Sequence, residues 1–395
     1  MKICGVVAEF NPLHNGHQFL LHSLRRSGAT HMVAVMSGNF VQRGEPAFAE
    51  KHLRTAWALA CGCDLVLELP LPYAMATAQR FAFGAMGILH SLGCVDMLGF
   101  GSEAGDSQPL YALARLLQKP DVSALIREKM AEKITYAKAR QMAVEQVAGP
   151  ELAALLSHPN NTLGLEYIGQ ALALGWNPQV VTIRREGAAH DSHIPHGGMP
   201  SASFIRSTYA DAKALEGLVP PEALPLYSQY AQLLPGRLEK LETAILSYLR
   251  RLPPDRLAAL PDLSEGLENR LAIAIGKAGS LEELYFGVKT KRYTLARIRR
   301  LVLSAFLEIE SGFCRQPPPY LRVLGMNSAG REILSRAKKT ASLPLSVSLA
   351  RLESLGGYAG QLARLEAAST DQYALCLPQP LPCGWDYRAP AVIVK

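Results

Sequence analysis

Residues 2–20 read KICGVVAEFNPLHNGHQFL, and this stretch decides the fold. Its first half is short, apolar and β-branched, which is typical of a buried strand. Asn11-Pro12 ends the strand in a turn, because the residue before a proline is disfavoured in helical geometry. Helical spacing then starts at about residue 15. His14 and His17 lie three residues apart at the first turn of that helix, so both can face one point.

The same point receives the positive end of the helix and its free backbone N–H groups, which favour phosphate. Gly16 lets the backbone approach a ligand closely. Two histidines can also donate hydrogen bonds to charge that builds on a phosphorus centre. A surface turn with two ordinary histidines is the alternative, but strand, turn, HNGH and helix coincide here. The sequence therefore predicts a phosphate site, with His14 and His17 as its catalytic residues.

Strand-like and helix-like stretches alternate over the first 210 residues. Apolar runs predict strands at 2–9, 31–37, 64–69, 97–100 and 179–183. Helical spacing fills the stretches 15–27, 50–61, 75–92, 122–148 and 160–174. Continuous apolar strands separated by helices indicate a parallel sheet covered on both faces, and ligands bind such sheets beyond the carboxyl ends of their strands. We therefore expect a Rossmann-like α/β domain over residues 1–212.

The pattern changes after residue 212. Apolar residues now recur at spacings of three and four, punctuated by Pro and Gly, which favours helices. We expect a mainly α-helical second domain over 213–395, with an extended tail beyond Leu377. The excess of basic residues also lies in this half, with 24 Lys and Arg against 18 Asp and Glu over 211–395. A polyanion would therefore meet the second half first.

Composition excludes several protein classes. The 395 residues are 49% hydrophobic and 19% charged, as in a globular chain with a sizeable core. No apolar run approaches the roughly 18 residues of a membrane span, and the N-terminus lacks the pattern of a secretory signal. The seven cysteines are scattered without a CxxC motif, which favours a reduced, cytoplasmic protein.

Two motifs now carry a resemblance. HNGH after an opening strand resembles the HxGH motif of the nucleotidyltransferase superfamily, which has a second, ISxTxIR-like signature late in the domain. SASFIR at 201–206 stands in that place, with Ser203 where threonine is usual. Its hydroxyls and Arg206, at a helix start, suit the β- and γ-phosphates of ATP. The resemblance implies a Rossmann-like sheet of the HxGH nucleotidyltransferase type.

A longer series of segments is more specific. In chain order these are FNPLHNGH, AVMSGNFVQRGEPA (34–47), DLVLELPLPYA (64–74), GFGSE (99–103), PNNTLGLEYI (159–168), IRREGAAHDS (183–192) and KTKRYTLARIRR (289–300). They closely resemble the bacterial tRNA(Met) cytidine acetate ligase family over most of the chain. The resemblance implies that ATP and acetate give acetyl-adenylate and pyrophosphate. The acetyl group then passes to N4 of the wobble cytidine of elongator tRNA(Met).

The resemblance also implies which residues bind ATP. The first segment is Val7, Ala8, Glu9, Phe10, Asn11, Pro12, Leu13, His14, Asn15, Gly16, His17, Gln18, Phe19 and Leu20. Further candidates follow later strands or open helices: Gly101, Asn160, Asn161, Arg184, Arg185, Ser201, Ser203 and Arg206. One of the two asparagines should contact ATP, as should one of Arg184 and Arg185, but the sequence leaves both choices open. For each, a turn, cap or solvated charge is the structural alternative.

Two further groups are expected to bind the other substrates. The loop after the second strand should line the acetate or base pocket through Ser37, Gly38, Asn39, Gln42 and Arg43, unless it is only a structural loop. The basic run should contact tRNA through Lys289, Lys291, Arg292, Arg297, Arg299 and Arg300, since cations bind phosphates; a solvated helix face is the alternative. Magnesium should accompany the pyrophosphate of ATP.

Other interpretations remain in view. His190, His193 and His196 could suggest a metal site, but they have no partner at zinc spacing, so we expect no metal held by the protein. GFGSEA follows the fourth strand rather than the first, which argues against a dinucleotide site. A small-metabolite adenylyltransferase would leave the basic half unexplained, and a non-catalytic RNA-binding protein would not need HNGH. The sequence indicates no membrane association and no protein partner.

Overall fold

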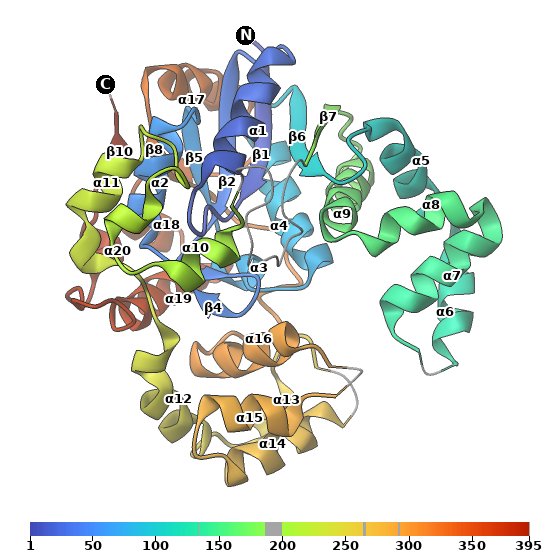
Figure 1. Cartoon of the computed structure of the whole chain (residues 1–395), viewed down its shortest axis with the longest axis vertical. Helices are drawn as coiled ribbons and strands as arrows, with labels where there is room; N and C mark the ends of the chain where they lie inside the picture. The colour runs from blue at the N-terminus through green and yellow to red at the C-terminus, as the bar shows by residue number, and fades with distance from the viewer. Residues whose placement is uncertain (133, 186–199, 264–265, 291–292, 395) are drawn as a thin grey trace.

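The computed structural model describes residues 1–132, 134–185, 200–263, 266–290 and 293–394 (Figure 1). Five residues discussed above lie outside these ranges: the histidines weighed as a metal site, His190, His193 and His196, and the predicted tRNA contacts Lys291 and Arg292. Among the residues described, no helix is long and apolar enough to cross a membrane.

A parallel sheet forms the centre of the molecule. Its five parallel strands are β1 (Ile3–Ala8), β2 (His31–Ser37), β5 (Leu65–Leu69), β6 (Met97–Ser102) and β7 (Gln179–Arg184). They lie in the order β5-β2-β1-β6-β7, so the chain runs outward from β1 first to one side and then to the other. Their carboxyl ends meet at one edge beside β1, which is where ligands bind in such sheets. The predicted Rossmann-like parallel arrangement is confirmed.

Helices cover both faces of this sheet, as predicted. On one face, Val33 and Val35 of β2 pack in a core with Phe81. On the other, Met32 and Ala34 of the same strand pack with residues of the helices that precede and follow it. The covering helices are α1 (Asn15–Arg26), α2 (Lys51–Ala60), α3 (Leu71–Ala74), α4 (Ala78–Ser91), α9 (Pro159–Ala173), α10 (Ala202–Thr208) and α11 (Leu224–Gln229).

The second half is mainly helical, as predicted, but it also contributes strands to the sheet, which the sequence analysis did not foresee. β8 (Leu321–Met326) returns to the sheet and pairs antiparallel with β5, while β10 (Val392–Ile393) and β9 (Leu345–Ser346) pair with β8. The run LRVLGM is wholly buried, as expected of a strand covered on both faces, and its one charged residue, Arg322, is paired there with Glu68 and Asp386. The helices around it are α17 (Ser328–Thr340), α18 (Leu349–Glu353), α19 (Gly357–Ala374) and α20 (Trp385–Arg388). The tail beyond Leu377 is therefore extended only in part.

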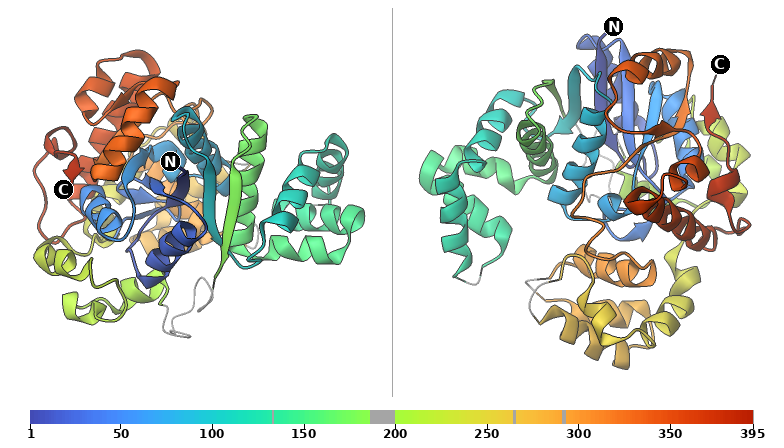
Figure 2. Two further views of the ribbon diagram at one scale, coloured as in Figure 1. Left: turned by 90° about the horizontal axis from the view of Figure 1, so that it is seen from above. Right: turned by 180° about the vertical axis from the view of Figure 1, so that it is seen from behind.

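Two helical parts project from different sides of this body (Figures 1 and 2). The first, after β6, comprises α5 (Ser107–Leu117), α6 (Pro120–Met130), α7 (Tyr136–Ala148) and α8 (Pro150–Ala154). Thr135 caps α7, so the single helix predicted over 122–148 is two. The second part has its own core and comprises α12 (Glu242–Leu249), α13 (Pro254–Ala258), α14 (Leu267–Lys277), α15 (Leu281–Val288) and α16 (Leu295–Phe306). It contacts the small hairpin of β3 (Phe40–Val41) and β4 (Glu45–Pro46).

Candidate functional site

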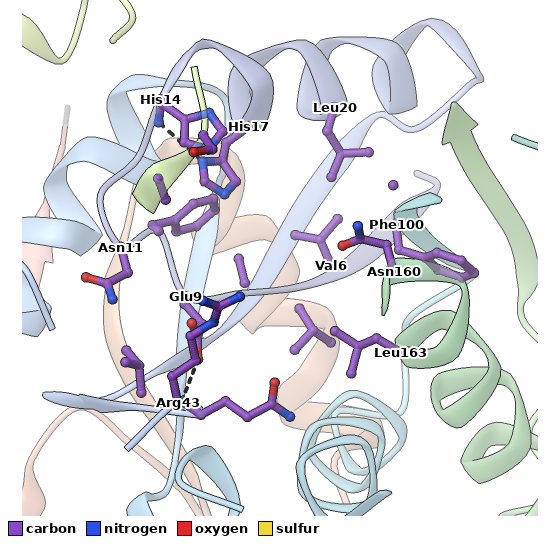
Figure 3. Close-up of a pocket in the computed structure, with 18 of the residues that line it drawn as sticks. Val6, Glu9, Asn11, His14, His17, Leu20, Arg43, Phe100, Asn160 and Leu163 are labelled. Atoms are coloured by element: carbon purple, nitrogen blue, oxygen red, sulfur yellow. Dashed lines mark hydrogen bonds between the residues drawn. The ribbon is translucent and has the colours of Figure 1, made fainter. Parts of the chain in front are cut away.

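A crevice opens beyond the carboxyl ends of β1 and β6 (Figure 3). Its walls come from the first strand–helix turn, the loop after β2, the end of β6, and the starts of α9 and α10. The predicted residues that line it are Val7, Ala8, Glu9, Phe10, Asn11, His14, His17, Leu20, Gln42, Arg43, Gly101, Asn160, Arg185, Ser201, Ser203 and Arg206. Segments separated by nearly 200 residues therefore meet where the sequence placed the phosphate site.

His14 and His17 form a close pair of rings, tilted by 38° to one another, at the start of α1. Their ring centroids lie 3.9 Å apart. Nδ1 of His14 accepts a hydrogen bond from the Gly16 N–H at 3.1 Å, and Nδ1 of His17 accepts one from the His14 N–H at 3.2 Å. A neutral imidazole whose Nδ1 is an acceptor carries its proton on Nε2. The capping arrangement therefore fixes both rings as Nε2–H donors.

Both imidazoles are neutral at physiological pH. Burial lowers the pKa of His14 well below its usual value, with further lowering by His17 and Arg185. Burial and Arg185 lower the pKa of His17 to about 3. A neutral donor can stabilise negative charge that develops on a phosphoryl oxygen without adding a proton to it. This arrangement suits displacement at a phosphorus centre.

Two arginines supply the positive charge of the crevice. Arg206 of α10 donates to the Asn11 carbonyl at 2.7 Å and to Ser203 Oγ at 3.3 Å. Ser201 caps the same helix by accepting from the Phe204 N–H at 3.0 Å. Arg185, directly after β7, is exposed to solvent and lines the crevice, and desolvation there lowers its pKa. The second sequence signature thus lies against the first, as the resemblance implied.

Gly101 is a glycine for a steric reason. A Cβ at this position would lie 3.2 Å from Cγ of Arg185, so a larger residue would push that side chain out of its place. Arg184, the other candidate after β7, points elsewhere: its guanidinium donates to the Ala104 carbonyl at 3.2 Å. The structure therefore directs Arg185, rather than Arg184, into the crevice.

Of the two candidate asparagines, only Asn160 lines the crevice. Asn160 lines the crevice, and its Nδ2 donates to Glu103 Oε1 at 2.6 Å. Asn161 is buried, and its Oδ1 accepts from the Ala104 N–H at 3.0 Å. Asn161 thus fastens the segment after β6 to α9, while Asn160 lies in the wall of the crevice.

Some predicted residues support the crevice from outside its walls. Leu13 is fully buried in the core. Asn15 donates to the Gly217 carbonyl at 2.8 Å and Gln18 to Glu222 at 2.9 Å, so both fasten α1 to a later segment. Three others, Gly16, Phe19 and Arg184, line an adjoining hollow that shares both histidines. Pro12 is buried, is not among the lining residues, and forms a cis peptide bond with Asn11.

The loop after β2 contributes only its distal half. Gln42 and Arg43 line the crevice, but Ser37, Gly38 and Asn39, which the sequence placed in the same pocket, are not among its lining residues. Asn39 is buried and bonds Thr370 at 3.1 Å and the Lys51 N–H at 2.8 Å. Of the five residues expected to line the acetate or base pocket, only Gln42 and Arg43 line the crevice.

Sequence reasoning missed Arg54. This α2 residue is fully buried, and its guanidinium donates to the carbonyls of Ala49 at 2.8 Å, Glu9 at 2.6 Å and Ser37 at 3.1 Å, and also to that of Gly38. It thereby ties together the ends of β1 and β2. Nothing in its helical spacing marks an arginine that hydrogen-bonds distant carbonyls, so the sequence held no signal for it.

The basic run makes contacts within the chain. Arg299 pairs with Glu45 of the β3–β4 hairpin, and Arg300 bonds Asp262 Oδ2 at 2.8 Å. Arg297 donates to the Asp262 carbonyl at 2.6 Å. Lys289 is exposed, with its ammonium 5.5 Å from the centre of the exposed Phe286 ring. The three arginines hold α16 to its neighbours, whereas Lys289 faces solvent.

The fold and site define a class of protein. A model of the HIGH Nucleotidyl Transferase family matches residues 1–382. A tRNA(Met) cytidine acetate ligase of a Thermoanaerobacter species is 36% identical over 99% of this chain and 100% of its own. One from Acetivibrio thermocellus is 34% identical over 96% of each chain.

The crystal structure of Thermotoga maritima TmcAL superposes over all of both chains with a TM-score of 0.94 at 32% identity. A second crystal form of that protein, bound with alpha-thio ATP, gives a TM-score of 0.91. This chain belongs to the tRNA(Met) cytidine acetate ligase family.

Proposed function

We propose that this protein is an ATP-dependent tRNA(Met) cytidine acetate ligase. It joins acetate to ATP as acetyl-adenylate with release of pyrophosphate, and transfers the acetyl group to N4 of the wobble cytidine of elongator tRNA(Met). The observation that carries the proposal is the pair of neutral Nε2–H donors, beside Arg185 and Arg206, at the mouth of a crevice in a chain of this family.

The first step needs positioning more than acid–base help. Acetate is already ionised near neutral pH, so it can attack the α-phosphorus directly once it is aligned. His14 and His17 stabilise the negative charge that develops on the α-phosphoryl oxygens, and the guanidinium groups of Arg185 and Arg206 neutralise the departing pyrophosphate. Gly101 leaves room for the nucleoside, and Asn160 hydrogen-bonds to it.

Magnesium belongs to this step as part of the nucleotide. Among the described residues, no group of three or more His, Cys, Asp or Glu side chains is placed to hold a metal ion. We propose that Mg²⁺ enters bound to the phosphates of ATP.

The second step requires that an anticodon base reach the same crevice. Cytosine N4 is a weak nucleophile because its lone pair is delocalised into the ring, so an activated acyl donor is chemically necessary. The helical part that contains α15 and α16 lies next to the β3–β4 hairpin, whose loop carries Gln42 and Arg43. We propose that this part grips the tRNA in the cytoplasm, with Lys289 and the partly exposed faces of Arg297, Arg299 and Arg300 toward its phosphates.

The direct test is nucleoside analysis. Purified protein, ATP, acetate and unmodified elongator tRNA(Met) are incubated, and the tRNA is digested and examined by mass spectrometry. N4-acetylcytidine at the wobble position is the expected product, and it should require both ATP and acetate. A small-metabolite adenylyltransferase would leave the tRNA unmodified.

A further inference from the structure

The transfer step must dispose of a proton. When an amine attacks an acyl-adenylate, its nitrogen loses one N–H, and a base in the crevice has to take it. His14 and His17 are unsuited, since each Nδ1 lone pair already accepts a backbone hydrogen bond. Burial also lowers the pKa of both rings, which makes them poor proton acceptors.

Two other groups in the walls are also unsuited. The Tyr167 hydroxyl lines the crevice, but burial raises its pKa well above the usual value, so it stays protonated. Glu45 lines the crevice too, but its carboxylate pairs with the Arg299 guanidinium. That ion pair engages the Glu45 carboxylate within the chain.

Glu9 remains. It follows β1 directly, lies in the wall of the crevice, and accepts the Gln42 N–H on Oε1 at 2.8 Å. Figure 3 shows it beside Arg43 and below the histidine pair. Burial raises its pKa above the usual 4.5, opposed by the Gln42 hydrogen bond and by Arg206, Arg54 and Arg43. Among the described residues, the charged or titratable groups that face it include these three cations, from α10, α2 and the loop after β2, and Tyr167 of α9.

We propose that the Glu9 carboxylate accepts a hydrogen bond from the exocyclic amine of the target cytosine and takes a proton from that amine during acetyl transfer. This inference rests on the proposed function. The N4 lone pair forms the new C–N bond to the acetyl carbonyl carbon, and the bond between that carbon and the phosphate oxygen breaks. AMP leaves with the electron pair of that bond. The N4 proton passes to the Glu9 carboxylate, which becomes a neutral acid and later returns the proton to solvent.

The same contact gives base selectivity. A carboxylate accepts a hydrogen bond from the cytosine amino group. Uracil presents a carbonyl oxygen at that position, which would face the carboxylate with no proton between them. The loop that carries Gln42 fixes the orientation of Glu9, so the loop after β2 and the end of β1 together form one acceptor for an aromatic amine.

The experiment separates the two half-reactions. Acetyl-AMP formation is followed by pyrophosphate release, and transfer is followed in a single turnover of acetyl-AMP-loaded enzyme mixed with tRNA(Met) transcript. Glu9→Gln keeps the size of the side chain but is not a base. We expect it to slow transfer by about 100-fold or more, the usual contribution of a general base, and to slow acetyl-AMP formation much less.

The pH profile of transfer supplies the second readout. Transfer by the wild-type enzyme should rise with pH through the raised pKa of Glu9, and this inflection should vanish in Glu9→Gln. Glu9→Asp, which keeps a carboxylate, should transfer slowly with the inflection retained, and it decides the matter if Glu9→Gln does not fold. Glu45→Gln, the matched change in the same wall, should keep the inflection.

Equal slowing of both half-reactions by Glu9→Gln, or an unchanged pH profile, would overturn the role of Glu9. Failure of the wild-type enzyme to acetylate tRNA would instead overturn the proposed function.

Discussion

The backbone N–H of His14 donates to Nδ1 of His17 at 3.2 Å, while the two rings lie with their centroids 3.9 Å apart. The first histidine therefore sets the tautomer of the second. His14 is itself fixed by the Gly16 N–H at 3.1 Å, and a Cβ at Gly16 would lie only 3.0 Å from Cε1 of the His14 ring, so His14, Gly16 and His17 all take part in one capping geometry. The glycine is the donor, and the spacing of three brings both Nε2–H groups to one side.

Loss of one of these donors should impair adenylation. His17→Ala should lower the rate of acetyl-AMP formation by about 10²–10³-fold, which is the usual cost of removing one oxyanion donor. Acetate-dependent release of pyrophosphate measures it. His22→Ala, an exposed histidine of the same helix, is the control and should behave as wild type. A normal rate for His17→Ala would remove the histidine from the mechanism.

Gly101→Ala should weaken ATP binding. The new methyl group would lie 3.2 Å from Cγ of Arg185, so the arginine would have to shift by a few tenths of an ångström in the wall of the crevice. We expect the KM for ATP to rise several-fold with a smaller change in kcat, measured by steady-state pyrophosphate release. Gly169→Ala on α9 meets no atom within 4 Å and should leave KM unchanged. Equal KM values for the two variants would show that Arg185 does not need this space.

The stability of the fold should depend on pH through Glu366. Burial, with the Glu68 carboxylate, raises its pKa from 4.5 to about 8. The folded chain then holds this proton more tightly than the unfolded chain, so the resulting stability is full below about pH 4.5 and is lost as the pH rises through about 8.

Glu366→Gln keeps an oxygen for the Leu71 N–H but cannot ionise. Its free energy of unfolding should decline less between about pH 5 and pH 8 than that of the wild type, as measured by urea denaturation. Glu132→Gln, at an exposed position, is the control. Parallel pH curves for Glu366→Gln and wild type would show that Glu366 does not hold its proton in the folded chain.

Lys289 should contribute to tRNA affinity without a structural cost. It is exposed beside Phe286, whereas Arg299 is engaged with Glu45. Lys289→Gln should weaken tRNA binding and reduce the slope of log K against log salt by about 0.7–0.9, the value for one phosphate contact. Filter binding at several salt concentrations measures it. The same change at Arg256, which pairs with Glu310, should leave the slope alone, and an unaltered slope for Lys289→Gln would place the RNA surface elsewhere.

The strands of the sheet were predictable because each is a short apolar run between helical stretches, and His31–Ser37 begins and ends where the sequence placed it. β8 was missed because its pattern is equally that of a buried helix segment, and only pairing with β5 distinguishes the two. The burial of Lys51 could not be predicted from the sequence. Its ammonium lies 2.6 Å from Glu68 and 2.7 Å from Asp386. No local pattern reveals a buried ion pair formed by residues more than 300 positions apart.

The candidate site, like the fold, was predictable from the sequence only in part. HNGH and SASFIR were found because each is a local arrangement of strand end, cap and helix. The choice of Arg185 over Arg184, and of Asn160 over Asn161, depended on which way neighbouring side chains point after the strands have packed. Glu9 was included only as part of a segment, because its contact with Gln42 and its place in the crevice wall are properties of the folded chain.

The central claim is that the crevice uses its paired imidazoles to join acetate to the α-phosphorus of ATP. Acetate-dependent exchange of labelled pyrophosphate into ATP, with no tRNA present, tests this step alone. We expect exchange that requires acetate and that is abolished in the His14→Ala/His17→Ala double variant. Exchange that proceeds without acetate, or that survives loss of both rings, would contradict it.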